Sequence, residues 1–179
     1  MSTATTWTID PAHSDVEFAV KHLMIFMVRG WFADVKGTVV MDDSDPAKAE
    51  VDVVIDANSI DTREARRDAH LKSPDFFEVE KFPLITFKST RVTDVQGNQF
   101  KLVGDLTIRG VSREVTLDVT SEGRAKDPQG AERAGFSAAT RVNRKDFGLN
   151  WNQALETGGV LVANKVRVEG EVQFVRQGE

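Results

Sequence analysis

Hydrophobic and polar residues alternate with a period of two in many short stretches of the chain. In HSDVEFAVKH, residues 13–22, every second position from Ser14 is mostly apolar, and charged residues occupy most of the positions between. This alternation is typical of a strand with one buried face. The same count predicts eight strands, over residues 14–22, 35–41, 51–55, 85–89, 100–108, 115–119, 136–142 and 166–174.

Turn-forming residues separate many of these strands. Gly, Pro, Asp, Asn or Ser stand in the segments 42–46, 96–98, 109–112 and 127–130, and such residues favour tight connections. Short connections join antiparallel neighbours. The sequence therefore predicts an all-β, antiparallel fold.

Two segments depart from the strand pattern. TREARRDAHL, residues 62–71, contains helix formers without Gly or Pro and predicts a helix with Asp61 or Thr62 as its N-cap. Ser73-Pro74-Asp75 is typical of the cap and first turn of a second short helix. Residues 143–162 form a long predicted loop that contains glycine.

Eight antiparallel strands, with a helical insertion between the third and the fourth, favour a closed barrel, because closure removes exposed strand edges. A two-sheet sandwich is the alternative. Four small residues, Gly37, Gly104, Ala138 and Gly170, stand in the middle of apolar strand faces where a filled core would need bulk. They indicate open space inside the barrel, although strand glycines also mark bulges and barrel corners.

Composition narrows the classes of function. A chain of 179 residues fits a single domain over residues 1–179. The net charge of −5 and the isoelectric point near 5.3 argue against nucleic acid as a partner. The absence of cysteine excludes disulfides, thiolate metal sites and thiol nucleophiles.

Neither the N-terminal segment nor the apolar runs suggest a targeting or spanning segment. The N-terminal MSTATTWTIDPAHS lacks the basic start and the apolar stretch of a secretory signal, so we expect a cytoplasmic protein. The longest apolar run, Leu23–Val28, is far shorter than the roughly 18 residues of a transmembrane helix. We expect no transmembrane segment. Transient contact with a membrane is compatible with this expectation.

Histidine and acidic residues do not form a persuasive catalytic or metal site. His13 and His22 fall on one predicted strand at opposite parity, about 30 Å apart if that strand is straight, so they would not share an ion with His70. Arg67, Asp68 and His70 would fan apart on a helix by about 100° per residue, which weakens their interpretation as an acid–base group. No nucleophile elbow, P-loop or dinucleotide motif is present. We therefore expect no metal, no catalytic residues and a protein that is not an enzyme.

A series of motifs resembles the YceI-like, polyisoprenoid-binding family. From Trp7 to about Phe174 they are, in order, WTIDPAHSDVEFAVKH, VRGWF, NSIDT, RDAHLKSPDFF, KFPLITFKS, GDLTIRGVS, RKDFGL and ETGG. The resemblance implies an extended, lipocalin-like, eight-stranded antiparallel barrel with a long apolar pocket. It also implies a hydrophobic small-molecule ligand, held without a covalent bond: an isoprenoid quinone, a polyprenyl phosphate or pyrophosphate, or a fatty-acid derivative.

The resemblance carries further expectations. It implies no other cofactor and is compatible with a homodimer. Many relatives are periplasmic, with a cleaved signal that is not visible in this sequence. The segment Leu23–Val28 is more apolar than is usual in the family, and we expect it to enlarge the mouth of the pocket.

The inward strand faces and the insertion together supply the candidate pocket residues. An insertion in an antiparallel barrel lies across an end or a flank, so its apolar side chains can complete the inner wall; the alternative is that the two adjacent phenylalanines fill a solid core. Two polar residues at the ends of strand faces, His22 and Arg91, are candidates for contact with a polar or anionic head group of the ligand. The candidate ligand-binding residues are Phe18, Val20, His22, Phe32, Val39, Val53, Ile55, Leu71, Phe76, Phe77, Phe82, Phe87, Arg91 and Leu102.

Three classes of function remain open at the level of sequence. The first is a carrier or store of a long-chain amphiphile, which the resemblance favours. The second is an enzyme that acts on a lipid. The third is a filled barrel that acts through its surface, as an interaction or stress-related protein.

Overall fold

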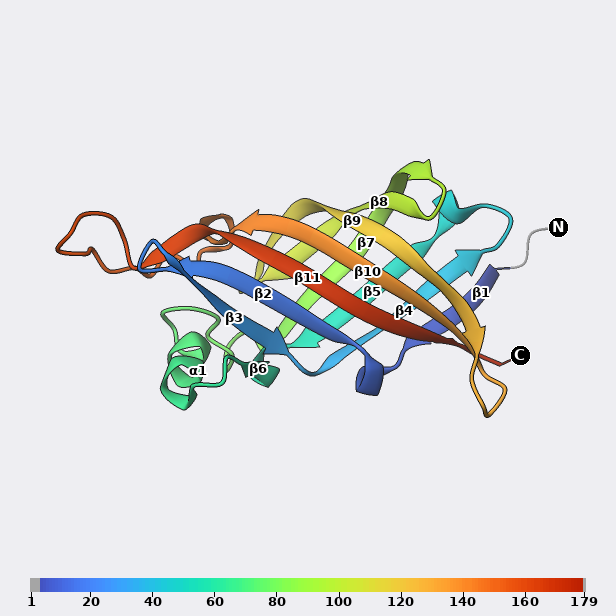
Figure 1. The fold of residues 1–179 in the computed structure, drawn as a ribbon, viewed down its shortest axis with the longest axis horizontal. Coiled ribbons are helices and arrows are strands. Elements are labelled where there is room, and N and C mark those ends of the chain that lie inside the picture. The colour runs from blue at the N-terminus through green and yellow to red at the C-terminus, as the bar shows by residue number, and fades with distance from the viewer. Residues whose placement is uncertain (1–3, 179) are drawn as a thin grey trace.

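The fold is a long barrel built almost entirely of strands (Figure 1). The computed structural model describes residues 4–178. Its strands are β1 Ala4–Ile9, β2 Asp15–His22, β3 Phe26–Phe32, β4 Val35–Asp42, β5 Glu50–Asp56, β6 Ile60–Asp61, β7 Leu84–Gln96, β8 Gln99–Ile108, β9 Val111–Lys126, β10 Glu132–Asn143 and β11 Val162–Arg176.

Eleven strand segments make eight strands, because three of the eight are interrupted. A short 3-10 helix, η1 Pro11–His13, separates β1 from β2, and residues 33–34 separate β3 from β4. A second one, η3 Ala57–Ser59, separates β5 from β6. The three interrupted strands are neighbours in the sheet. β1 pairs with β4 and β2 with β3, and on the other side β4 pairs with β5 and β3 with β6.

The sheet closes through β1 and β11, which pair antiparallel. Every other pairing in the barrel is antiparallel as well. The prediction of an eight-stranded antiparallel barrel is therefore confirmed, and the sandwich alternative is wrong. Closure pairs the edges that an open sheet would expose.

The second strand begins much earlier than the alternation predicted. It starts at Phe26 and not at Val35, because the apolar run before it has no polar partner positions to reveal its period. The turn that precedes it also lacks Gly, Pro or Asn: Leu23 and Met24 take positive φ angles of 54° and 67°. The other predicted strands lie within observed ones, except that the first begins one residue before β2, and several observed strands are longer.

The insertion between β6 and β7 holds one helix, α1 Ala65–Lys72. Its N-cap is Glu64, whose carboxylate accepts a hydrogen bond from the backbone N–H of Arg67. The prediction of Asp61 or Thr62 as the cap is wrong, because both are used elsewhere: Asp61 accepts from Arg63 N–H, and Thr62 is bonded to α1 by its side chain. Residues 73–75 form a turn and no second helix.

The four small mid-strand residues divide into two kinds. A methyl group on Gly104 would lie 2.5 Å from the Lys88 carbonyl oxygen, and one on Gly37 would lie 2.3 Å from that of Asp52. These two glycines permit close approach of neighbouring strands, so their interpretation as open space is wrong. Gly170, in contrast, has only ordinary neighbours at 3.6 Å or beyond and, with Ala138, borders a cavity.

Two groups of buried side chains stabilise the barrel. The larger runs from the closing strands to the insertion and includes Trp7, Val35, Phe76 and Phe147. The smaller, centred on Phe87, Leu102 and Val119, covers the side formed by β7, β8 and β9. Between these groups the barrel is not filled.

Candidate functional site

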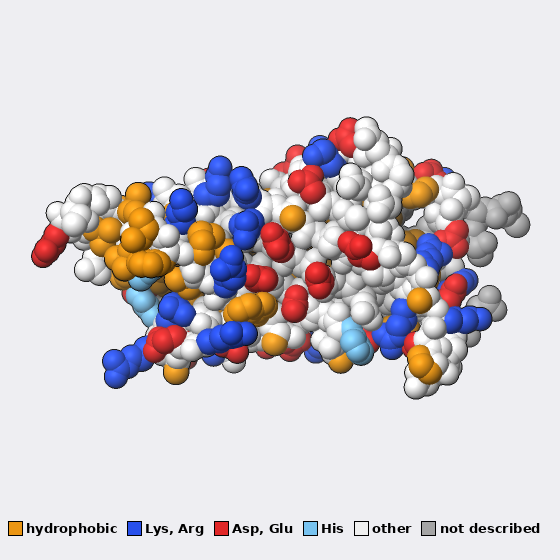
Figure 2. Space-filling view, in the orientation of Figure 1, with side chains coloured by type: hydrophobic (Ala, Val, Ile, Leu, Met, Phe, Trp, Pro, Cys, Tyr) orange, Lys and Arg blue, Asp and Glu red, His pale blue; other side chains and the backbone are white. Residues whose placement is uncertain are grey.

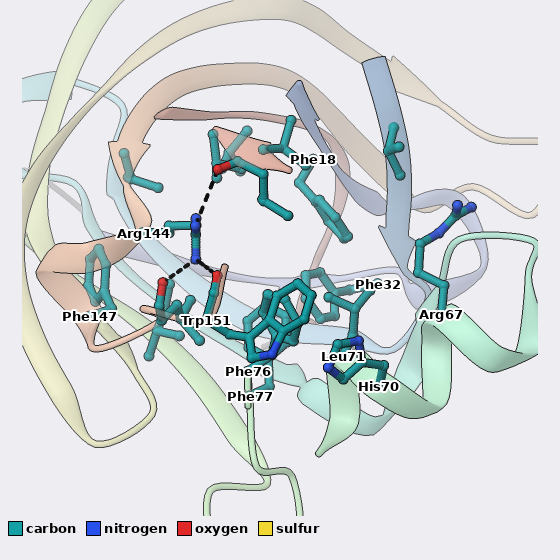
Figure 3. A pocket seen from close by; sticks show the side chains of 18 of the residues that line it. Phe18, Phe32, Arg67, His70, Leu71, Phe76, Phe77, Arg144, Phe147 and Trp151 are labelled. Carbon is teal, nitrogen blue, oxygen red and sulfur yellow. Dashed lines mark hydrogen bonds between the residues drawn. The ribbon is translucent and has the colours of Figure 1, made fainter. Parts of the chain in front are cut away.

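A cavity of about 460 Å³ occupies the end of the barrel that carries α1 (Figure 3). Its volume falls in the range of about 300–1,000 Å³ that is typical of small-molecule sites. Side chains from β2, β3, β5, β7, β8, β10 and β11 form its barrel side, and the insertion and the loop after β10 form the rest. Most of the lining side chains are aliphatic or aromatic.

The insertion supplies an aromatic wall to this cavity. Phe76 is 7% exposed, and its ring lies 5.4 Å from the ring of Trp151, measured between centroids. Phe77 packs edge-on against Phe32 of β3. His70 of α1 contacts both Phe76 and Trp151, with ring centroids 5.0 and 4.6 Å away. The two adjacent phenylalanines thus both border the cavity and contact different partners.

Polar contacts fix the insertion in place. Arg67 donates through Nε to the Thr62 hydroxyl and through Nη2 to the Thr62 carbonyl, at 2.9 and 2.8 Å. Asp68 accepts from the Thr62 backbone N–H at 2.9 Å and from its hydroxyl. His70 Nε2 pairs with the carboxylate of Asp75 at 2.8 Å. Arg67 and Asp68 therefore bind the start of the insertion at Thr62.

A buried arginine stands in the wall opposite the insertion. Arg144, the first residue of the 3-10 helix η4 Arg144–Phe147, is 4% exposed and lines the cavity. Its guanidinium donates to the carbonyl oxygens of Leu149, Trp151, Val162 and Ala163 at 2.5–3.3 Å. No carboxylate pairs with it among residues 4–178, and burial lowers the pKa of the Arg144 guanidinium.

This arginine places a positive charge beside an apolar cavity. Four carbonyl dipoles satisfy four of its five N–H groups, but they carry no net charge. An anionic or carbonyl-bearing group in the cavity would find a favourable electrostatic field at this wall.

The cavity has a polar rim. Lys21 and His22 at the end of β2, and Glu64, Arg66 and Arg67 at the start of α1, belong to its lining. Lys21, Glu64 and Arg66 are exposed, while His22 and Arg67 are half-buried. The mouth therefore lies between the β2–β3 turn and α1, at the left end in Figure 1.

A second cavity, of about 540 Å³, fills the other part of the barrel. It extends toward the β4–β5 and β7–β8 connections, through Pro46 and Gly97. Both cavities are lined by Val16, Ile55, Leu106 and Val168. The two cavities therefore adjoin, and together they follow the long axis of the barrel.

Most of the candidate pocket residues lie on one of these two cavities. Around the first are Phe18, Val20, His22, Phe32, Ile55, Leu71, Phe76 and Phe77. Around the second are Val39, Val53, Ile55, Phe87 and Leu102. Their contact with a ligand stays a prediction.

Two candidates lie elsewhere. Arg91 is exposed and forms an ion pair with Glu114 at 3.5 Å, because a bulge between Ser89 and Arg91 reverses the parity of β7. Past the bulge Val92 packs with the apolar cluster in place of Arg91. Phe82 lies over Gly110 and beside Lys81, outside both cavities, because the chain turns there toward the β8–β9 connection.

Arg144 and Trp151 were not among the candidates. Both follow β10 in a segment without periodicity, so parity could not place them. The signal was the arginine that opens RKDFGL, since a buried arginine among aromatic and aliphatic neighbours needs a specific set of acceptors.

The described residues contain no candidate metal-binding site. Within residues 4–178, no group of three or more His, Asp or Glu side chains is arranged to hold an ion. Over the same residues, no helix has both the length and the apolarity required to cross a bilayer.

Comparison with known proteins agrees with the geometry. The YceI-like domain model matches residues 7–174, nearly the whole chain. The chain belongs to the YceI-like family. A relative in Staphylococcus aureus strain N315, the UPF0312 protein SA2479, is 41% identical over 171 residues, which are 95% of this chain and 97% of the relative.

Solved structures of YceI-like and related proteins share the fold. The YCEI protein of Campylobacter jejuni is 31% identical and superposes with a TM-score of 0.75 over 89% of this chain and 90% of its own. A polyisoprenoid binding domain from Saccharophagus degradans is 14% identical, with a TM-score of 0.71 over 97% of this chain and 99% of its own. The latter similarity concerns the fold alone.

Proposed function

We propose that this protein binds, and carries or stores, a long-chain amphiphile in its barrel. The observation that carries the proposal is the pair of adjoining apolar cavities along the barrel axis, which share four lining residues. A long, flexible hydrocarbon tail is the kind of molecule whose shape fits such a space. Support comes from the family, and from the similarly folded polyisoprenoid binding domain of S. degradans.

Apolar burial is sufficient to drive such binding. Each CH₂ group removed from water contributes about 0.8 kcal/mol. Ten such groups contribute on the order of 8 kcal/mol before the cost of association is subtracted. The head group then needs only a few orienting contacts.

Arg144 is our candidate for one of these contacts. Its charge is buried in the cavity wall without a carboxylate partner among the described residues. Hydrogen bonds to charged groups are about twice as strong as neutral ones. This favours a ligand with an anionic or carbonyl-bearing end, such as a polyprenyl phosphate, a fatty-acid derivative or an isoprenoid quinone.

A binding role is favoured over catalysis. Arg67 and Asp68, the candidate acid–base residues, are both held by Thr62, and His70 is paired with Asp75 at the end of α1. A residue that transfers protons must reach the reacting group, and these contacts direct Arg67 and Asp68 toward the frame of the insertion. The open interior likewise favours a carrier over a filled barrel.

Native mass spectrometry and fluorescence quenching test the proposal. The purified protein should retain a lipid-sized ligand, or take one up at near-stoichiometric amount from a panel of prenyl quinones, prenyl phosphates and fatty acids. Trp151 borders the first cavity, whereas Trp7 is fully buried outside it, so a quinone should quench Trp151. A Trp151→Phe variant is the control for the origin of the signal. A flat titration across all three ligand classes would reject the proposal.

A further inference from the structure

We propose that the β2–β3 turn is a docking tip that inserts into the surface of an anionic lipid bilayer beside the cavity mouth. The proposal goes beyond ligand binding in the barrel, since docking and ligand binding can each occur without the other. It rests on an exposed apolar turn, an unusual backbone conformation and a polarised distribution of charge.

The turn exposes five consecutive large hydrophobic residues. Leu23, Met24, Ile25, Phe26 and Met27 are each at least 40% exposed, with Ile25 at 73% and Phe26 at 58%. Single exposed apolar residues are ordinary, but a contiguous group marks an interaction surface. Val160 of the loop before β11 is also exposed and adds to it at the same end, where Leu23 N–H donates to the Leu161 carbonyl. We call Leu23–Met27 the apolar tip.

The backbone holds these side chains out at a cost. Residues 22–25 form a β-turn, in which Ile25 N–H donates to the His22 carbonyl at 3.3 Å. Hairpin turns with positive φ at both central positions normally use Asn-Gly or similar pairs. Here the two positions are Leu23 and Met24, with φ angles of 54° and 67°. Bulky side chains rarely adopt this conformation, and it recurs at sites of function. A turn selected only to connect two strands would not need apolar residues at these positions.

Basic side chains follow directly behind the apolar tip, on the outer face of four adjacent strands. Arg141 of β10 pairs across the sheet with Arg167 of β11, which is opposite Ala19 of β2, and Ala19 is opposite Arg29 of β3. Nearer the tip, Lys21 is opposite Met27, and Lys165 is two positions before Arg167 on the same face. Lys21, Arg141 and Lys165 form no ion pair within the described chain.

Acidic residues lie farther from the tip. Glu17 of β2 is opposite Glu169 of β11, and Asp15 is opposite Glu171. On the face drawn in Figure 2, hydrophobic side chains gather near the left end with an acidic side chain beyond them, Lys and Arg follow, and Asp and Glu lie near the middle, while the right end carries both charges. A molecule with a net charge of −5 therefore presents a basic collar behind an apolar end. We define the basic collar as Lys21, Arg29, Arg141, Lys165 and Arg167.

This order fits a lipid surface with negative head groups. Apolar side chains enter the region between head groups and acyl chains, while Lys and Arg remain at the level of the phosphates. The carboxylates of β2 and β11 are then kept away from the surface. Two exposed carboxylates at the same end do not fit the order: Glu156 on the loop before β11 and Glu64 on the rim of the mouth. Removal of Glu156 should strengthen docking.

The tip adjoins the cavity mouth. Two residues that line the first cavity, Lys21 and His22, directly precede the tip in sequence. Two more lie beside it in space: Val162 pairs with His22, and the Leu161 carbonyl accepts from Leu23 N–H. A bilayer in contact with the tip would face this opening. An amphiphile could then pass between membrane and barrel without exposing its tail to water.

Vesicle flotation tests the proposal with the full chain. We use vesicles of phosphatidylcholine alone and vesicles with about one-third phosphatidylglycerol. The protein should float with the anionic vesicles and much less with the neutral ones, and about 0.5 M salt should release it because it screens charge. Failure to bind anionic vesicles at low salt would overturn the proposal.

Matched variants separate the tip from general stickiness. Ile25→Ser with Phe26→Ser should reduce the vesicle partition at least about tenfold, since both residues are exposed before docking and buried after it. Val95→Ser, an exposed apolar residue on β7 near the β7–β8 connection, is the control. Lys21→Glu with Lys165→Glu should also reduce it about tenfold or more, whereas Lys36→Glu with Lys126→Glu should have little effect. Equal loss in both members of a pair would contradict docking through the tip.

A probe on the tip distinguishes a bilayer from a second copy of the chain. The sequence has no cysteine, so Ile25→Cys gives a single attachment point for an environment-sensitive dye. Its emission should shift to the blue on anionic vesicles and stay constant as protein concentration rises without lipid. A concentration-dependent shift with formation of a dimer would reject the membrane assignment. Ligand titration of the same variants is read separately, so loss of docking with normal quenching by quinone leaves the proposed function intact.

Discussion

The ring of Phe77 meets the ring of Phe32 edge-on, with centroids 5.7 Å apart and planes at 88°. Phe77 belongs to the insertion and Phe32 ends β3, so this contact joins the insertion to the barrel at the cavity wall. Edge-to-face pairs of aromatic rings stabilise by about 0.5–1.5 kcal/mol beyond the area they bury. Phe76 faces the other way, toward His70 and Trp151.

Alanine substitution of the two phenylalanines should affect both binding and stability, to different extents. In a solid core, Phe→Ala costs about 3–5 kcal/mol of unfolding free energy. Because both rings border a cavity, we expect a smaller loss for Phe77→Ala, and a larger one for Phe76→Ala, which is more buried. Both variants should lose lipid affinity, and the ligand-induced rise in melting temperature should shrink. Strong destabilisation of both apo variants, with unchanged affinity in the folded fraction, would show that the pair is core and not pocket.

Replacement of Arg144 separates its structural role from its role toward a head group. Arg144→Met removes four hydrogen bonds to carbonyls, and each buried acceptor left without a donor costs about 1–3 kcal/mol. We expect a clear loss of stability in denaturant unfolding, which Arg144→Lys should partly recover. In the folded protein, affinity for a prenyl phosphate should fall about tenfold more than affinity for an uncharged prenol of equal length. Equal losses for the two ligands would argue that the head group lies away from Arg144.

Two glycine variants test whether a tail extends through both cavities. Gly170 borders the second cavity and has room for a larger side chain. Gly170→Leu should therefore fold, retain short-chain ligands and weaken the binding of long-chain ones. Gly104→Ala is the contrasting variant: its methyl group would collide with the Lys88 carbonyl, and we expect a loss of about 1–3 kcal/mol. If Gly170→Leu leaves the preference for chain length unchanged, the tail does not reach the second cavity.

Asp10 should make the stability of the barrel sensitive to acid. Arg133, which donates to Asp10 Oδ2 at 2.7 Å, and His13 together lower the pKa of the Asp10 carboxyl from 3.8 to about 2. A carboxyl with a lowered pKa in the folded state stabilises it above the unfolded pKa, and this contribution is lost as the pH falls from about 4 toward 2. Arg133 also lowers the pKa of the Asp127 carboxyl. Through its two ion pairs, Arg133 joins β10 to the β1–β2 connection at Asp10 and to the β9–β10 connection at Asp127.

The measurement compares melting temperatures from pH 6 down to about pH 2. Asp10→Asn should be less stable than the wild type near pH 6, and the difference should shrink as the pH falls. Glu50→Gln, at an exposed carboxylate on β5, is the control and should follow the wild type. A difference between Asp10→Asn and wild type that stays constant over this range would show that the ion pair does not contribute in this way.

Sequence patterns were most informative where one strand face is buried and the other exposed. The alternation around Val16 and Phe18 identified β2 and its inward face, which lines the first cavity. The pattern failed where its physical basis was absent. Leu23–Val28 is apolar at every position, so the start of β3 was hidden, and the bulge after Ser89 reversed the parity that had assigned Arg91 to the interior.

The site could be predicted where it is built from strands and from the insertion. Phe76 and Phe77 were assigned to the wall from their place in an antiparallel topology, and both border the first cavity. Arg144 and Trp151 were missed because they lie in irregular structure whose position depends on long-range contacts. The subdivision of the interior was also hidden, since Gly104 and Gly170 look alike in sequence and differ in their neighbours.

The barrel closes where β11 pairs with β1 and β2, and this closure can form only late in the folding of the chain. One edge of β11 follows β10 throughout, while its other edge pairs first with β2 and, near its end, with β1, bringing Trp7 opposite Arg176. A chain under synthesis cannot make these last pairings until almost all of it has left the ribosome, and contacts so distant in sequence form slowly. Until then the apolar side chains that line the two cavities face an open trough on one side of an incomplete sheet.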